Sequence, residues 1–253
     1  MTRSIVWFRR DLRLTDHPAL AAALEHSEVI PVFVIDPMLI ESDRTGRKRL
    51  SWLAANLRAL DQSLRKRGSK LIVRRGDPAA ELLALAKEAG ANHIYFNLDL
   101  TPYARQRDRR VGLELENNGI TVEAFDDVTL HHPEEATTMN GRPYQVFTAF
   151  KRAWLLKAKP AVTDLSIAPQ SLALTIDLPS CEINFGDDSI ELPRAGEEAA
   201  LEQLDRFLDS AIFGYAEGRN QLDRNGTAFL SPYLRYGMMS IRQAYWGAKA
   251  AID

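Results

Sequence analysis

Residues 29–35 read VIPVFVI, residues 48–67 read KRLSWLAANLRALDQSLRKR and residues 70–74 read KLIVR. The first and third runs are short and rich in apolar residues, which is typical of buried strands. The middle run carries leucines at the spacing of one helix face, namely Leu53, Leu57, Leu60 and Leu64. Strand, helix and strand joined by short connections predict a parallel crossover, because only a helix returns the chain to begin the next parallel strand.

The same alternation extends over the first half of the chain. Strands are predicted at Ser4–Phe8, Val29–Ile35, Lys70–Arg74, His93–Asn97 and Thr121–Phe125, all of them mostly apolar on both faces. Helices are predicted at Pro18–Glu25, Lys48–Arg67, Ala79–Glu88 and Ala104–Asn118. The predicted fold class is therefore α/β, with a doubly wound, five-stranded, parallel, Rossmann-like sheet over residues 1–130.

Beyond this half the pattern weakens into a connector, predicted at residues 131–196, with four prolines and many acidic residues in its later part. Helical periodicity returns at Glu197–Leu208 and continues irregularly through Tyr215. A last helix begins at Ser240, with Gln243 three residues later in a capping-box arrangement. Residues 197–253 are predicted to be the truncated start of an all-α domain, too short to close a core of its own.

Composition narrows the function classes. The chain has 253 residues and a single cysteine, Cys181, which excludes an intramolecular disulfide and a cysteine-based zinc cluster. The adjacent His131 and His132 would point to opposite faces of a strand, so no metal site is predicted. The sequence contains neither an apolar run that could cross a membrane nor a secretory signal, which predicts a cytoplasmic protein with no membrane partner.

A net charge of −2 gives no general attraction to nucleic acid, so any DNA affinity needs a local basic patch. Residues 139–160 carry five Lys and Arg residues and no acid. This stretch could face DNA or could be a solvated helix face.

In a doubly wound sheet, ligands bind beyond the carboxyl ends of the strands, where the strand order reverses. The loops there are Arg9–Leu14, Asp36–Arg49, Gly76–Pro78 and Asn97–Tyr103. None of them holds a G-x-G-x-x-G or Walker sequence. The first loop carries three arginines around one aspartate, which suits an anionic or polar planar ligand, or equally a loop held by internal ion pairs.

Several motifs closely resemble those of the DNA photolyase and cryptochrome family. They are VWFRRDLRL at 6–14, GDP at 76–78, YFNLD at 95–99, PYARQRD at 102–108, PYQVFTAF at 143–150 and GTAFLSPYLRYG at 226–237. The resemblance implies an N-terminal domain that holds a light-harvesting antenna chromophore, followed by a helical domain that binds FAD. It also implies a deoxyribodipyrimidine photolyase, which repairs cyclobutane pyrimidine dimers in UV-damaged DNA. Most of the catalytic half would lie beyond residue 253, so this chain alone is expected to be inactive.

The resemblance also implies site residues. For the antenna chromophore these are Arg10, Asp11, Arg49, Asn97 and Asp99, although Asn97 and Asp99 could equally be turn residues after a strand. Tyr103 and Ala104 stand where folate-binding members carry an Asn-Glu pair, which favours a deazaflavin or FMN over folate.

For FAD, the implied residues are Tyr215, Thr227, Ala228, Phe229, Leu230 and Ser231, and Arg219 is expected to reach the DNA backbone. Hydroxyls of Thr227 and Ser231 beside backbone N–H groups at a helix start suit a diphosphate. Ala228 replaces a serine common in the family, which could remove one phosphate hydrogen bond. The same residues could be no more than a turn followed by a helix cap. A cryptochrome photoreceptor and a stand-alone α/β nucleotide-binding module remain alternative functions.

Overall fold

The computed structural model describes residues 3–25, 28–43, 45–162, 172 and 176–253. Five parallel strands form one sheet in the order β3-β2-β1-β4-β5. They are β1 (Arg3–Phe8), β2 (Glu28–Ile35), β3 (Ile72–Arg75), β4 (His93–Asn97) and β5 (Thr121–Phe125). The predicted five-stranded doubly wound sheet is confirmed, and its strand order reverses between β1 and β4.

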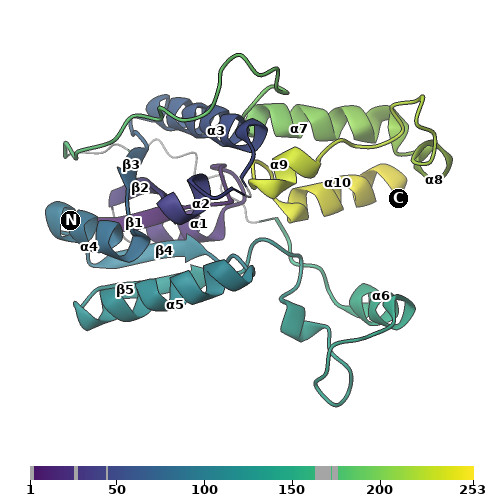
Figure 1. The fold of residues 1–253 in the computed structure, drawn as a ribbon. Helices are drawn as coiled ribbons and strands as arrows, with labels where there is room; N and C mark the ends of the chain where they lie inside the picture. Colours follow the sequence, from purple (N-terminus) through teal and green to yellow (C-terminus); the bar gives the residue numbers. More distant parts are fainter. Residues whose placement is uncertain (1–2, 26–27, 44, 163–171, 173–175) are drawn as a thin grey trace.

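Helices cover both faces of this sheet (Figure 1). On one face α1 (Pro18–Leu24) and α3 (Arg47–Arg65) bury their apolar side chains against Val6 and Phe8 of β1. On the other face α4 (Pro78–Ala89) and α5 (Pro102–Asn117) pack against Ile5 and Trp7. Because successive residues of a strand point to opposite faces, a strand between two helical layers must be apolar throughout.

The edge strand β5 departs from that pattern. Its residues are exposed or half-buried, whereas β1 and β2 are buried along almost their whole length. β5 is therefore not buried on both faces as the central strands are, because its position at the edge removes one neighbouring strand and part of the helical cover.

The rest of the structure consists of short elements that periodicity did not predict, one of them in the first half, and of two helices in the second half that it did predict. The elements are α2 (Pro37–Ile40), a 3-10 turn (Pro133–Glu135), α6 (Phe147–Leu156), α7 (Glu197–Arg206), a π turn (Phe207–Ala211), α8 (Tyr215–Gly218), α9 (Ser231–Arg235) and α10 (Ile241–Ile252). The predicted capping box at the start of α10 is confirmed, since Ser240 and Gln243 exchange both hydrogen bonds.

Helices α7, α9 and α10 pack beside α3 (Figure 1). Leu204, Leu230 and Met238 are buried in the same core as the sheet residues, and the ring of Trp52 on α3 meets that of Tyr233 at a centroid distance of 5.5 Å. The buried apolar side chains of this region therefore extend the core of the α/β part instead of forming one of their own.

The turn between α9 and α10 touches the loop after β1. Leu12 donates its backbone N–H to the Tyr236 carbonyl at 3.0 Å. Gly237 has a φ of +59°, and a Cβ at this position would lie 2.7 Å from the Asp11 Cα. Only glycine accepts both the left-handed conformation and this close approach.

A buried charge network also joins α10 to the α/β part. Asp127 lies 2.6 Å from both Arg13 and Arg242, and Arg242 also pairs with Asp16 at 2.9 Å. The two carboxylates and two guanidiniums are all buried. Buried charges are tolerated when they are paired in this way, so the network fixes where α10 sits.

The later connector runs along the other edge of the sheet. The Cys181 N–H bonds to the Val73 carbonyl at 2.8 Å, and the Val73 N–H bonds to Ser180 Oγ at 2.9 Å. These contacts cover the edge of β3. Residues 163–171 and 173–175 of the predicted connector lie outside the described residues.

Candidate functional site

A cavity of about 220 Å³ lies beyond the carboxyl ends of β1 and β2. Three of the four predicted loops line it, and the loop at 76–78 does not. The wall also includes residues from α3, from the connector and from the end of α9. The lining residues include Trp7, Arg10, Phe33, Ile35, Asp36, Leu39, Arg49, Leu53, Asp99, Tyr103, Arg107, Phe185, Arg235 and Tyr236.

Three guanidinium groups share this cavity wall with one nearby carboxylate. Arg10 lies 3.3 Å from Asp99 and donates from Nε to the Arg235 carbonyl at 3.0 Å. Burial and the positive charges of Arg10 and Arg49 lower the pKa of Arg235. Burial opposes ionisation of Asp99, but the Thr101 N–H and the charge of Arg10 outweigh it and lower the pKa of Asp99. The excess of positive charge favours an anionic group at this place.

The opposite wall presents aromatic faces. The Tyr103 hydroxyl donates to the Asp36 carboxylate, and the Arg107 guanidinium lies over the rings of Trp7 at 4.8 Å and Tyr103 at 5.7 Å. Burial and Asp36 raise the pKa of Tyr103 to about 12, so the phenol stays protonated. With Phe33 and other apolar side chains beside them, these groups can hold a flat ring by stacking and burial.

Two of the five predicted antenna residues lie beneath the cavity and not on its wall. Asp11 accepts hydrogen bonds from the Arg9 N–H at 2.6 Å and from Asn97 Nδ2 at 2.8 Å, and it contacts His17 Nε2 at 3.1 Å. Asn97 Oδ1 accepts from the Ala19 N–H. Asp11 is 3% exposed and Asn97 4%, so their side chains are already used inside the protein. Asp11 and Asn97 hold the loop, whereas Arg10, Arg49 and Asp99 face the cavity.

The ionisation of Asp11 follows from the same contacts. Burial would raise its pKa, but the charge and hydrogen bond of His17 and the Arg9 N–H more than compensate and lower it to about 2. Arg9 and Arg13 pair internally with Asp108 and Asp127. Two of the three arginines in the first loop, Arg9 and Arg13, are therefore paired inside the protein. Arg9 and Arg10 line the cavity, and Arg10 is the more exposed of the two.

A second set of predicted residues gathers at the far end of α7. A Cβ at Gly226 would overlap the backbone of Gly218, so the two glycines bring the segment 215–219 against the segment 226–231. The Arg219 guanidinium lies 5.9 Å from the centre of the Tyr215 ring. Phe229 has a φ of +50°, a conformation that is rare for a bulky residue and is found mainly at turns and ligand clamps.

The remaining predicted FAD residues differ in what they can contact. Ser231 is exposed at the first residue of α9, and Thr227 is half-buried. The Ala228 carbonyl accepts a hydrogen bond from Gln203 at 3.0 Å. The side chain of Leu230 is buried in the hydrophobic core, so this residue could contact a ligand only through its backbone.

Sequence reasoning did not assign most of the cavity wall to the antenna site, including Asp36, Arg107, Phe185 and Arg235. Asp36 was within a predicted loop and could have been singled out by its charge. Arg235 lies inside the motif at 226–237, but nothing in that motif connects it to the loops of the sheet, and Phe185 carries no local signal. Among the described residues no cluster of His, Cys, Asp or Glu could hold a metal, and none of their helices is long and apolar enough to span a membrane.

Comparison with known proteins shows the family to which the chain belongs. The family model described as DNA photolyase matches residues 4–169. The chain belongs to the DNA photolyase family. This photolyase-family chain is 35% identical to the deoxyribodipyrimidine photo-lyase of Synechococcus sp. (strain ATCC 27144 / PCC 6301), over 98% of the chain and 54% of that protein. It therefore spans about half the length of that relative.

Two further comparisons bear on fold and length. The crystal structure of a class III photolyase from Agrobacterium tumefaciens superposes with a TM-score of 0.86 at 32% identity, covering 98% of this chain and 53% of that one. An uncharacterized 31.6 kDa protein of Synechococcus sp. (strain PCC 6716) is 38% identical over 98% of this photolyase-family chain and 90% of its own length. The family thus includes relatives of about this size as well as relatives about twice as long.

Proposed function

We propose that this chain is the light-harvesting half of a deoxyribodipyrimidine photolyase, together with the first part of its FAD site. The whole activity would be the light-driven repair of cyclobutane pyrimidine dimers in UV-damaged DNA. One observation carries the proposal: a cavity at the carboxyl ends of β1 and β2 is lined both by aromatic side chains and by arginines, among them Arg10, Arg49 and Arg235. This combination suits a planar chromophore with an anionic tail.

The size of the cavity indicates that it would enclose only part of a chromophore, with the rest lying outside it. Its volume of about 220 Å³ is below the roughly 300–1,000 Å³ typical of sites that enclose a whole ligand. A flat ring system would lie against Tyr103, and the rest of the molecule would extend past Arg10, Arg49 and Arg235. FMN or a phosphorylated deazaflavin carries a phosphate that those arginines can bind. The preference over folate rests on Tyr103 and Ala104, which stand where folate-binding members of the family carry an Asn-Glu pair.

The residues of the chain would position the antenna chromophore and keep water from it. Phe33, Leu53 and Phe185 would shield the ring, and the arginines would fix its anionic end. The chromophore, when bound, supplies light absorption and passes its excitation to FAD. Tyr103 would remain protonated at any physiological pH, because its pKa is about 12.

At the second site, Tyr215 and the segment 227–231 would begin the grip on FAD. The support is the contact that joins them through Gly218 and Gly226, and the strained backbone of Phe229. Arg219 ends the short helix α8, is exposed, and lies beside the ring of Tyr215. Its guanidinium group would therefore be able to bind DNA phosphates next to the FAD site. Leu230 is left out of this proposal because it belongs to the core.

Titration of the purified chain with FMN, FAD, a deazaflavin and a folate, followed by flavin or folate fluorescence, tests the antenna assignment. We expect FMN or the deazaflavin to bind and folate to bind at least tenfold more weakly. Arg49→Ala should weaken FMN binding about tenfold, and Arg65→Ala on the exposed side of α3 should not. Equal binding of FMN by both variants, or no uptake of any flavin, would refute the assignment.

Repair of dimers under blue light is measured for the 253-residue chain and, as a comparison, for a full-length photolyase. The 253-residue chain alone is expected to leave dimers intact under blue light, because the longer photolyases have about twice its length. A cryptochrome is the second candidate, and it would bind the same chromophores without repair at full length. A stand-alone nucleotide-binding module would bind nucleotides in the cavity with no dependence on light.

A further inference from the structure

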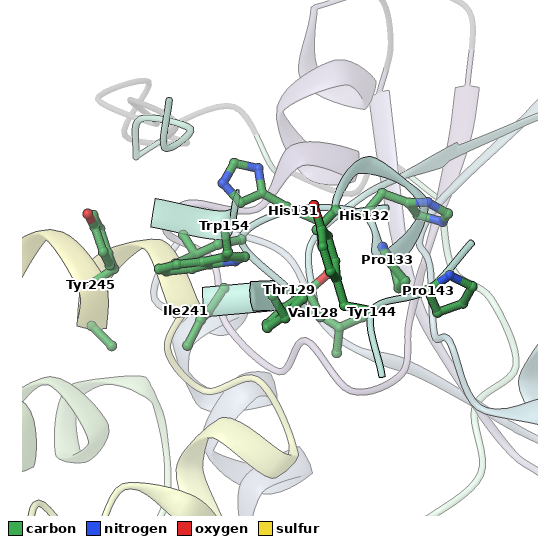
Figure 2. A pocket seen from close by; sticks show the side chains of 14 residues that line it. Val128, Thr129, His131, His132, Pro133, Pro143, Tyr144, Trp154, Ile241 and Tyr245 are labelled. Carbon is green, nitrogen blue, oxygen red and sulfur yellow. The ribbon is translucent and has the colours of Figure 1, made fainter. Parts of the chain in front are cut away.

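The four tryptophans of the chain differ in their surroundings. Trp7 on β1 is 1% exposed and is the one that lines the cavity at the carboxyl ends of β1 and β2. Trp52 is also buried, on α3. Trp154 and Trp246 both pack against the Tyr245 ring, and Figure 2 shows Trp154 and Tyr245 in the groove between α6 and α10. Trp7 is therefore the tryptophan whose chemistry bears on a ligand in the cavity.

Two guanidinium groups lie against the Trp7 ring. The Arg9 guanidinium carbon is 4.6 Å from the ring centre, and that of Arg107, on α5, is 4.8 Å from it. Both groups bind one carboxylate, that of Asp108, at 2.6 Å and 2.9 Å. Burial and the charge of Arg107 lower the pKa of Arg9, and the charge of Asp108 opposes them. Because arginine stays protonated in proteins, these three side chains hold two positive charges and one negative charge beside the ring.

A tryptophan close to an excited flavin competes with energy transfer. The excited ring system is a strong oxidant, and it can take one electron from an indole a few ångströms away without touching it. The chromophore is then reduced by one electron and the indole becomes a radical cation, until the electron returns and the excitation is lost as heat. A chromophore in the cavity is exposed to this loss, because Trp7 belongs to the wall.

The charges beside Trp7 oppose its oxidation. A cation is attracted to the electron-rich face of a neutral indole. Once the ring has lost an electron, the same cation faces a second positive charge, and the repulsion is strong because the site is buried. The Arg107 guanidinium also lies 5.7 Å from the centre of the Tyr103 ring, so its charge opposes oxidation of that ring as well.

We propose that Arg9 and Arg107 keep Trp7 from giving an electron to an excited flavin or deazaflavin in the cavity. The two arginines act through Trp7 and preserve the excitation for transfer to FAD. This inference rests on the proposed function, because it takes the ligand of the cavity to be a light-absorbing chromophore.

Time-resolved fluorescence of FMN bound to the chain tests the proposal. The lifetime belongs to the bound chromophore, so it does not depend on how tightly a variant binds FMN. Arg107→Gln should shorten it at least twofold, and transient absorption should show a tryptophan radical formed at the same rate. Arg110→Gln is the matched control, because Arg110 is exposed on the same helix and pairs with Asp77 outside the cavity. Equal lifetimes in the two variants would overturn the proposal.

Two further variants separate the charge of Arg107 from its packing. Arg107→Lys keeps the positive charge and should keep the lifetime of the unaltered chain. Adding Trp7→Phe to Arg107→Gln removes the electron donor and should restore most of the lifetime. Asp108 keeps Arg9 as a partner in every variant, so the fold should tolerate them. A lifetime that stays short in Arg107→Lys or in the double variant would refute a role of this charge at Trp7.

Oxidation of the chromophore-free chain separates this inference from the proposed function. The carbonate radical anion removes single electrons from tryptophan, and peptide mass spectrometry locates the oxidised residues. In Arg107→Gln the yield at Trp7 should rise at least threefold relative to that at Trp52, which is 5% exposed. An unchanged ratio would overturn the inference. A raised ratio in a chain that takes up no flavin would count against the proposed function alone.

Discussion

Replacing Gly237 by alanine should separate the α9–α10 turn from the loop after β1. A left-handed φ of +59° costs a non-glycine residue about 1–2 kcal/mol. The new methyl group would also overlap the Arg10 carbonyl oxygen and lie 2.7 Å from the Asp11 Cα, so backbone must move. Overpacking of this kind costs about 1–3 kcal/mol. Gly237→Ala should therefore lower the free energy of unfolding by about 3 kcal/mol.

Urea denaturation of this variant, followed by far-UV circular dichroism, measures the loss. Gly112→Ala is the matched control, because Gly112 lies inside α5 and a Cβ added there would have no atom within 4 Å. That substitution should raise stability by about 0.5–1 kcal/mol. FMN affinity should fall with Gly237→Ala as well, since Arg235 and Tyr236 would leave the cavity wall. A loss below about 1 kcal/mol would refute the reasoning, because the left-handed backbone alone should cost that much.

Three further outcomes follow from the buried charges and the cavity. The folded-state pKa of Asp11 is about 2, against an ordinary value of 3.8, so the stability it contributes is complete above about pH 4 and is lost as the pH falls towards 2. Asp11→Asn should flatten the fall in unfolding free energy between pH 5 and pH 2 by about 2 kcal/mol in urea titrations, and an unchanged slope would contradict this. Arg242→Met leaves buried carboxylates short of a partner and should cost about 3 kcal/mol in thermal or urea unfolding. Lys249→Met, which removes an exposed pair on the same helix, should cause no measurable change, and equal effects would show that burial is not the cause. Arg235→Gln should weaken FMN binding about tenfold in fluorescence titrations, whereas Arg105→Gln, at an exposed position outside the cavity, should not; a loss of less than twofold at Arg235 would remove it from the anion site.

Local signals were sufficient for the sheet and its helices. The strands are short apolar runs, and α3 and α4 carry apolar residues at helical spacing, so each element could be predicted within a few residues of its observed bounds. The capping box of α10 could also be predicted, because its two hydrogen bonds join residues that are only three positions apart. Elements of four or five residues, such as α2 and α9, are too short to show any period.

Local sequence signals predicted only part of the candidate site. Arg10, Arg49 and Asp99 were predicted and face the cavity, whereas Asp11 and Asn97 lie in the same motifs and point inward. A motif records which residues are needed at a strand end, but it does not distinguish those that touch a ligand from those that hold the loop.

The sequence by itself determined the order of strands and helices, the place of the ligand loops and the family to which the chain is similar. Only the tertiary structure decided that Arg235 completes an arginine cluster with Arg10, residues separated by more than two hundred positions. It also decided that α10 is held by Asp16 and Asp127, and that no residue of α6 is fully buried within the described structure. The physical reason is that periodicity and capping act over a few neighbouring residues, whereas a cavity wall or an ion pair depends on how the whole chain packs.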